Sequence, residues 1–159
     1  MCWRIGGGGD VQTNGTLSTD DSVGGNLSSE KALAARLHHN TIGQNLSLDG
    51  GGGGVNCDPQ DALQGSPAYA TVEDNQIGWN ATVTNWKTCW LGFFRNTVTK
   101  NVTYNNNVTA DPDGNEVQTN TVGGNLSCSR NDPAPQEGDS GGSPNTVAGE
   151  ATDQCASLV

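Results

Sequence analysis

Three residues around a tight turn offer oxygen atoms of the kind that bind calcium. Asp111, Asp113 and Asn115 alternate within the segment Asp111-Pro112-Asp113-Gly114-Asn115-Glu116, and carboxylate and amide oxygens are the ligands that Ca²⁺ prefers. The segment lacks the full spacing and the distal glutamate of an EF-hand loop. A Pro-Asp-Gly turn between two strands explains the same residues without a ligand. We therefore expect this segment to form a turn between strands. Asp111, Asp113 and Asn115 remain a weak candidate for a calcium site, and we expect no other cofactor.

A glycine-rich segment closer to the C-terminus resembles a catalytic one. Gly138-Asp139-Ser140-Gly141-Gly142-Ser143 is similar to the nucleophile segment of chymotrypsin-like serine proteases, in which the serine attacks and neighbouring amides bind the oxyanion. The two histidines, His38 and His39, stand in Arg36-Leu37-His38-His39-Asn40, which does not resemble the setting of that family's catalytic histidine. A motif counts only in its structural context. We therefore interpret the segment as a loop and assign no catalytic residue.

Aromatic residues gather in one stretch near the middle of the chain. Trp86, Trp90 and Phe93 all lie within the range 86–95. Exposed together, such rings could stack on a sugar or dock a partner. Packed inward, they would close the core, which is the commoner fate of large apolar side chains. We favour core packing and keep Trp86, Trp90 and Phe93 as a possible ligand patch.

These segments are set in a sequence that repeats itself. Each unit has an aliphatic anchor, two corner residues that are often glycine, and then, in all but the last unit, an asparagine before a second apolar residue. The anchors are Val23, Ile42, Ile77, Val98, Val122 and Val147. They are 19, 35, 21, 24 and 25 residues apart, and Asn-Thr precedes most of them. One such unit cannot bury its apolar face alone, so neighbouring units must stack.

Each position of the repeat has a physical interpretation. The anchor points inward, and the glycines after it turn the chain where a Cβ would cause strain. The asparagine tolerates the left-handed backbone region, and its amide can bond the same asparagine of the next unit. Apolar residues then recur two apart, as in Leu46 and Leu48 or Ala81 and Val83. This is strand periodicity, with serine or threonine facing out.

The repeat predicts an all-β fold, a parallel β-helix (β-solenoid) of about six rungs. A β-sandwich is the alternative, but it would not need the same corner chemistry in each unit. The long step between Ile42 and Ile77 predicts one long inserted loop over residues 49–74, beginning with the run Gly50 to Gly54. We expect residues 1–159 to form a single domain, because the length allows one core and not two.

The cysteines indicate an oxidising compartment. They are Cys2, Cys57, Cys89, Cys128 and Cys155. None is spaced as in a zinc site. The simplest pairing is sequential, Cys57 with Cys89 and Cys128 with Cys155, although sequence order does not fix connectivity and buried thiols are the alternative. Disulfides would imply secretion. Met1-Cys2-Trp3-Arg4-Ile5 lacks the apolar region of a signal peptide, so we expect an extracellular protein whose leader is not in this sequence.

The composition limits the partners. The formal net charge is −10 and the pI is about 4.2, with only seven lysines and arginines. Such a chain cannot neutralise a run of phosphates, so we expect no nucleic-acid binding, and attraction to anionic lipid is equally unexpected. No apolar run approaches the ~20 residues that cross a bilayer, so no membrane insertion is expected. The many neutral, turn-forming residues favour an ordered all-β chain over a disordered one.

The C-terminal part of the sequence resembles a known group of proteins. The segments that carry the resemblance are Asn120-Thr121-Val122-Gly123-Gly124-Asn125-Leu126-Ser127-Cys128, Asn131-Asp132-Pro133-Ala134-Pro135, Asn145-Thr146-Val147-Ala148-Gly149 and Asp153-Gln154-Cys155. They are similar to the ending of uncharacterised secreted actinobacterial repeat proteins of β-helix type. The resemblance implies secretion, a right-handed parallel β-helix, and a disulfide between Cys128 and Cys155 that closes a C-terminal segment of about 120–159. It implies no catalytic residues.

A regular repeat without a convincing catalytic constellation favours a structural role. We expect a secreted, non-enzymatic structural or adhesive module at the cell surface or in the extracellular matrix, with carbohydrate or another cell-surface polymer as a possible partner. The alternative is a carbohydrate-active enzyme, a polysaccharide lyase or hydrolase of β-helix fold, which rests on analogy between folds alone. For that alternative, Arg95 and Lys100 are the central candidates for a base.

Overall fold

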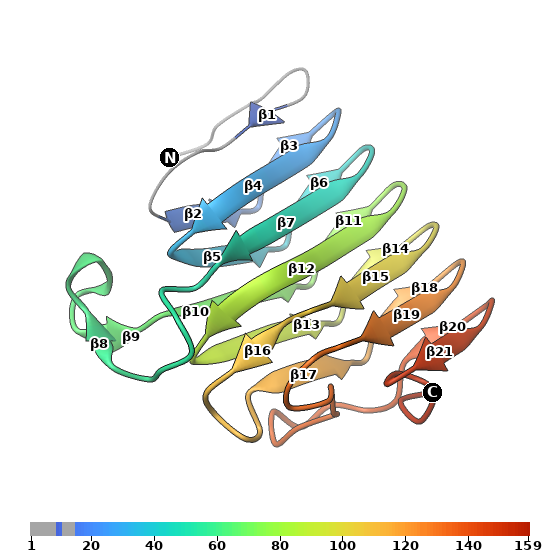
Figure 1. Ribbon diagram of the computed structural model, residues 1–159. Helices are drawn as coiled ribbons and strands as arrows, with labels where there is room; N and C mark the ends of the chain where they lie inside the picture. The colour runs from blue at the N-terminus through green and yellow to red at the C-terminus, as the bar shows by residue number, and fades with distance from the viewer. Residues whose placement is uncertain (1–8, 11–14) are drawn as a thin grey trace.

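Short parallel strands organise the chain in the computed structural model, which describes residues 9–10 and 15–159 (Figure 1). Nearly all of these strands belong to three sheets in which the hydrogen-bonded neighbours run parallel. Within the described part of the chain, no helix has the length and apolarity needed to cross a membrane. The all-β chain with parallel strands that the repeat predicted is therefore confirmed.

Sheet A contains the longest strands and faces the viewer in Figure 1. Its strands, in order, are β1 (Gly9–Asp10), β4 (Leu27–Ala32), β7 (Leu46–Gly51), β12 (Ala81–Thr88), β15 (Val102–Asn105), β19 (Leu126–Ser129) and β21 (Ala151–Asp153). The short strand β16 (Val108–Thr109) pairs with the end of β12.

The other two sheets complete each turn of the chain. Sheet B contains β2 (Gly15–Thr19), β5 (Ala34–His38), β10 (Tyr69–Glu73), β13 (Trp90–Phe94) and β17 (Asn115–Gln118). Sheet C contains β3 (Ser22–Val23), β6 (Thr41–Ile42), β11 (Gln76–Ile77), β14 (Thr97–Val98), β18 (Thr121–Val122) and β20 (Thr146–Val147). The chain passes from sheet C to sheet A to sheet B and returns to sheet C one strand further on; we call one such passage a rung.

The core is a set of apolar columns between the three sheets. The repeat anchors pair in register from β3 to β20, for example Ile42 with Ile77 and Ile77 with Val98. The second apolar residue of each unit forms another column, in which Leu46 pairs with Ala81. Most of these side chains are fully buried. Stacking removes from water the apolar face that a single rung would expose.

A row of buried asparagines runs beside the core where sheet B turns into sheet C. This inner asparagine ladder comprises Asn40, Asn75, Asn96, Asn120 and Asn145. From Asn40 to Asn120, the backbone N–H and the Nδ2 of each residue donate to the Oδ1 of the next asparagine, at 2.8–3.1 Å. The ladder explains why Asn-Thr precedes most anchors: the threonine begins sheet C, and the asparagine satisfies buried backbone groups.

A second row occupies the turn from sheet C into sheet A, where the repeat predicted it. This outer asparagine ladder comprises Asn26, Asn45, Asn80, Asn101 and Asn125, all exposed or half-buried. Its donors point the other way along the stack: both Asn45 and Asn80 donate from their backbone N–H and Nδ2 to the Oδ1 of the preceding asparagine. The predicted contact between equivalent asparagines is therefore present.

Two details of the predicted corner differ from the structure. The asparagines of the outer ladder do not adopt left-handed backbone angles; the residues before the inner ladder do, at φ of 56–58° for His39, Asp74 and Arg95. The corner glycines are not left-handed either. A Cβ on Gly43 would lie 2.5 Å from the carbonyl oxygen of Gly24. Glycine is needed there because neighbouring rungs approach closely, not because of its own conformation.

The inserted loop leaves the stack after Gly51 and returns at Tyr69 (Figure 1). It carries the antiparallel pair β8 (Pro59–Gln60) and β9 (Ser66–Pro67) around the 3₁₀ turn η1 (Asp61–Leu63). The loop is shorter than the range 49–74 expected from the sequence, because β7 and β10 keep their pairing on both sides.

Two disulfides connect the pairs that sequential order favoured. Cys57 in the loop is bonded to Cys89, just before β13. Cys128 in β19 is bonded to Cys155, and the residues after β21 turn inward so that Leu158 joins the core. Both disulfides are consistent with an oxidising environment.

Candidate functional site

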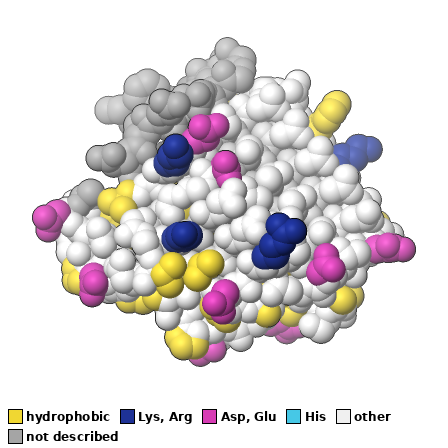
Figure 2. Space-filling view, viewed as in Figure 1, with side chains coloured by type: hydrophobic (Ala, Val, Ile, Leu, Met, Phe, Trp, Pro, Cys, Tyr) yellow, Lys and Arg dark blue, Asp and Glu magenta, His cyan; other side chains and the backbone are white. Residues whose placement is uncertain are grey.

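Two rows of aligned polar side chains, nearly all of them serine or threonine, lie on the outer surface. On sheet C the outward residues form an exposed row of Ser22, Thr41, Gln76, Thr97, Thr121 and Thr146. A second, half-buried row on sheet A comprises Ser28, Ser47, Thr82, Thr103, Ser127 and Thr152. Figure 2 shows that the face formed by sheet A is mostly uncharged polar surface with scattered charges. Neighbouring groups of each row are one strand spacing apart, about 4.8 Å.

Trp79 lies at the corner between sheets C and A, beside the hydroxyl row of sheet C. Its side chain is 55% exposed, the most exposed of the described aromatic residues. Backbone hydrogen bonds place it between Gln44 on the preceding rung and Lys100 on the following one. An exposed indole offers a flat apolar face and one N–H donor, and nothing in the fold requires a tryptophan at this position.

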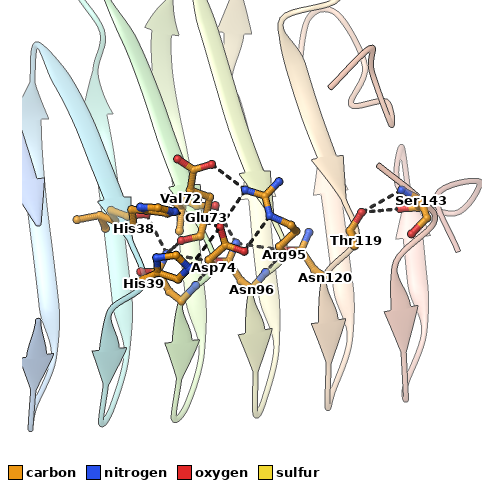
Figure 3. Close-up of polar contacts among 12 residues, drawn as sticks. His38, His39, Val72, Glu73, Asp74, Arg95, Asn96, Thr119, Asn120 and Ser143 are labelled. Atoms are coloured by element: carbon orange, nitrogen blue, oxygen red, sulfur yellow. Dashed lines mark hydrogen bonds and ion pairs between the residues drawn. The ribbon is translucent and has the colours of Figure 1, made fainter. Parts of the chain in front are cut away.

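Charged side chains meet at another corner, where sheet B turns into sheet C (Figure 3). This corner cluster comprises His38, His39, Glu73, Asp74 and Arg95. His38, Glu73 and Phe94 end strands β5, β10 and β13 in register. The next residue on each rung is left-handed, which turns the side chains of His39, Asp74 and Arg95 outward into one column. The sheet register therefore brings together residues that are far apart in sequence.

Arg95 binds both carboxylates of the corner cluster. Its Nε lies 2.8 Å from Asp74 Oδ1, and its Nη2 lies 2.9 Å from Asp74 Oδ2 and 2.9 Å from Glu73 Oε2. The hydrogen bond from Arg95 holds the pKa of Asp74 below its ordinary value, against a smaller opposing effect of burial. The same contact raises the pKa of Arg95. The guanidinium also lies over the ring of Phe94, 5.2 Å from its centroid.

Both histidines face Asp74. His38 Nε2 lies 3.2 Å from Asp74 Oδ2, and His39 Nε2 lies 4.0 Å from the same oxygen. The two imidazole rings are 3.9 Å apart between centroids. His38 is half-buried and His39 exposed, so solvent reaches the site. Two imidazoles and a carboxylate can exchange protons, pair ionically or bind a metal ion.

The calcium candidates do not converge on one site. Asp113 is exposed, and its backbone N–H bonds Asp111 Oδ1 in a local turn. Asn115 is fully buried, accepts the hydroxyl proton of Tyr104, and donates to the carbonyl of Pro133. Its amide stabilises the core, so this segment does not present three oxygen ligands together.

The residues of the aromatic patch come from two sheets, Trp86 from β12 of sheet A and the other two from β13 of sheet B. Trp86 and Phe93 have no exposed surface and belong to the core, so neither can contact a ligand. Trp90 points outward from β13, is half-buried, and packs against Phe94 at 5.6 Å between ring centroids. Core packing, which the sequence favoured, therefore holds for Trp86 and Phe93. Trp90 is three residues before Phe93 on the same strand, so strand alternation directs the two side chains to opposite faces.

The protease-like segment is a turn that covers a buried carboxylate. It crosses the outer face of β17, and a Cβ on Gly138 or Gly142 would overlap the side chain of Glu116 or Gln118. Glu116 is fully buried and accepts a hydrogen bond from Gln118 Nε2 at 2.7 Å, while its Oε1 has no partner among the described residues. Burial raises the pKa of Glu116.

The residues considered for serine-protease or lyase chemistry lie at separate places in the fold. Strands β10 and β13 separate the histidines at the end of β5 from the segment over β17, so Ser140 has no histidine beside it. Arg95 is held by two carboxylates. Lys100 lies past the opposite end of β14, at the corner that carries Trp79. The two candidates for a base therefore lie at different corners of the rung.

Neither a protein-family model, nor a curated protein, nor a solved structure matches this chain. The surfaces are therefore interpreted from their own geometry. Trp79 and the corner cluster were both missed from the sequence. Trp79 stands where equivalent units have Gly, Gln or Lys, and the cluster occupies the one or two positions before the first three asparagines of the inner ladder. Aligning the units as columns would have revealed Trp79, whereas the cluster also depends on which rungs pair across the insertion.

Proposed function

We propose that this protein is a secreted, non-enzymatic adhesive module, a right-handed parallel β-solenoid of about six rungs that binds carbohydrate or another cell-surface polymer. The observation that carries the proposal is the exposed Trp79 beside an exposed row of hydroxyls. The two disulfides agree with an extracellular location. The resemblance of the C-terminal segments to secreted repeat proteins supports the same location.

The proposed binding surface is the ridge between sheets C and A, which we call the Trp79 ridge: Gln44, Gln76, Trp79, Thr97 and Lys100. An indole stacks on the apolar face of a pyranose ring, and the amide, hydroxyl and ammonium groups around it can bond sugar hydroxyls. All five side chains are exposed. Because the rungs repeat, a polymer lying along the ridge would meet a polar side chain of the sheet C row at each step, and the indole at one of them.

Sedimentation with insoluble chitin, cellulose and purified peptidoglycan tests the proposal. We expect the protein to bind at least one of these polymers, and Trp79→Ala to weaken that binding roughly 3- to 10-fold, because an aromatic contact contributes about 0.5–1.5 kcal/mol. Trp79→Tyr should retain most of the binding.

Val55→Ala is the matched control, since Val55 is also a large exposed apolar residue, at 47%, but lies on the inserted loop. Binding that is unchanged in Trp79→Ala, or absent for all three polymers, would contradict the proposal. Release of soluble products from a polymer, abolished by Arg95→Ala or Lys100→Ala, would instead favour the carbohydrate-active enzyme.

A further inference from the structure

The corner cluster contains the only two histidines of the sequence. One donor atom from each of His38, His39 and Asp74 can be chosen so that all three lie within 4.8 Å of one another. His38 ends β5 and His39 is the left-handed residue after it. This turn directs two adjacent side chains to the same side of the corner, which a continuous strand would not do.

The separations suit a small divalent ion. Zinc binds imidazole nitrogen and carboxylate oxygen at about 2.0–2.2 Å, so tetrahedral ligand atoms lie roughly 3.4 Å from one another. His38 Nε2 and Asp74 Oδ2 are already 3.2 Å apart. His39 Nε2 is 4.0 Å from that oxygen. The His39 side chain is 54% exposed, and the ring that it lies against is that of His38, itself a proposed ligand, so little opposes a small rotation.

Arg95 does not prevent such a site. An ion bound to Asp74 Oδ2 would replace one hydrogen bond from Arg95 Nη2, which would keep its bond to Glu73 Oε2. Arg95 Nε would still hold Asp74 Oδ1. A carboxylate ligand is commonly oriented by such a hydrogen bond through its other oxygen.

The local charge also favours a divalent cation. Asp20, on the preceding rung, has its Oδ1 3.9 Å from His39 Nδ1. With Glu73, Asp74 and Arg95 it gives the corner three carboxylates and one guanidinium, a net charge of −2 when both imidazoles are neutral. Through a bridging water, Asp20 could fix the orientation of His39, as carboxylates do for metal-bound histidines.

We propose that His38, His39 and Asp74 bind Zn²⁺, with the fourth coordination position open to water. The ion would connect the end of β5 to the end of β10 on the next rung, which carries the inserted loop. This proposal does not depend on polymer binding by the Trp79 ridge, which lies at a different corner.

Titration of the protein with ZnCl₂, followed by calorimetry and by NMR of the imidazole signals, tests the proposal. The protein should carry Cys2→Ser and a purification tag without histidine, so that every imidazole signal comes from this site. We expect one Zn²⁺ per chain, shifts in both imidazoles, a rise in the melting temperature and reversal by EDTA. An absence of imidazole shifts up to about 1 mM Zn²⁺ would overturn the proposal without any variant.

Three substitutions identify the ligands: His38→Gln, His39→Asn and Asp74→Asn. Asparagine suits the last two because it tolerates the left-handed conformation that His39 and Asp74 adopt. Since loss of an outer partner alone weakens metal binding about 10- to 100-fold, each ligand substitution should weaken it by at least that much. Asp153→Asn is the matched control, because Asp153 is also an exposed, left-handed aspartate. Equal affinity in the control and Asp74→Asn would reject the assignment.

Discussion

Asn96 shows how a single residue connects three rungs. Its Oδ1 accepts hydrogen bonds from the backbone N–H and the Nδ2 of Asn75, while its own Nδ2 donates to Asn120 Oδ1 and to the carbonyl of Val72. Its side chain is buried, so water cannot replace these bonds. Asn101 makes similar amide contacts in the outer ladder. It is exposed, so water can replace these bonds.

We predict that Asn96→Ala lowers the free energy of unfolding by about 2–4 kcal/mol, because the N–H of Asn75 and the carbonyl of Val72 lose buried partners. Asn101→Ala should cost less than about 1 kcal/mol, since its partners lie at the surface. Urea unfolding of both variants measures the difference. Equal losses would mean that burial does not distinguish the two ladders.

The role of asparagine was only half predictable from the sequence. A polar residue repeated beside two apolar ones at a corner indicates a ladder, and the outer ladder is present. The inner ladder has the same residue type before a threonine, and nothing local distinguishes a buried amide from an exposed one. Burial of Asn75 or Asn120 depends on how three sheets close around them, which is a property of the assembled fold.

At the scale of elements, the turn from sheet C into sheet A depends on how closely two rungs approach. Gly24 and Gly43 occupy the same position on neighbouring rungs, and Gly43 N–H bonds the carbonyl of Val23. A Cβ on Gly43 would lie 2.5 Å from the Gly24 oxygen and 3.0 Å from its carbonyl carbon, whereas a Cβ on Gly24 would meet no atom of the described residues within 4 Å.

Gly43→Ala should therefore destabilise the protein by about 1–3 kcal/mol, as overpacking usually does. Gly24→Ala should be neutral or stabilising by up to about 1 kcal/mol, because Gly24 is not left-handed and alanine restricts the unfolded chain. Melting temperatures of the two variants, each compared with the parent, provide the test. A loss of stability in Gly24→Ala would contradict this account of the corner.

Strands were predictable where apolar residues alternate, as in β7 and β12, because alternation follows directly from strand geometry. The corner cluster was not, because His39 and Asp74 are brought together by sheet register across an insertion. Which side chains of the aromatic stretch point inward was not predictable for a similar reason. Trp86 and Phe93 point inward and Trp90 outward, and the sequence does not say where the turn between β12 and β13 resets the alternation.

At the scale of the whole molecule, the two disulfides differ in exposure. Cys57 is exposed on the inserted loop, and its partner Cys89 is buried but keeps 9% of its surface exposed. Cys128 and Cys155 have no exposed surface. Because thiol–disulfide exchange requires access of the attacking thiolate to sulfur, the folded protein should protect one disulfide and not the other.

We predict that dithiothreitol under native conditions, followed by alkylation and mass spectrometry, labels Cys57 and Cys89 well before Cys128 and Cys155. In denaturant all four should react together, which serves as the control, and Cys2→Ser removes the fifth thiol. Earlier labelling of Cys128 than of Cys57 would show that the C-terminal segment opens more readily than the inserted loop.

The inner ladder also has an electrical polarity. Its amides point their N–H groups toward the later rungs, so their dipoles add along the stack. At the last rung Asn145 Nδ2 donates to the carbonyls of Val117 and Leu158. The carbonyl oxygen of Leu158 thus accepts a hydrogen bond at the positive end of this row, while the Leu158 side chain packs against the core. The outer ladder is oriented in the opposite sense, so the amide dipoles of these two rows oppose each other along the stack.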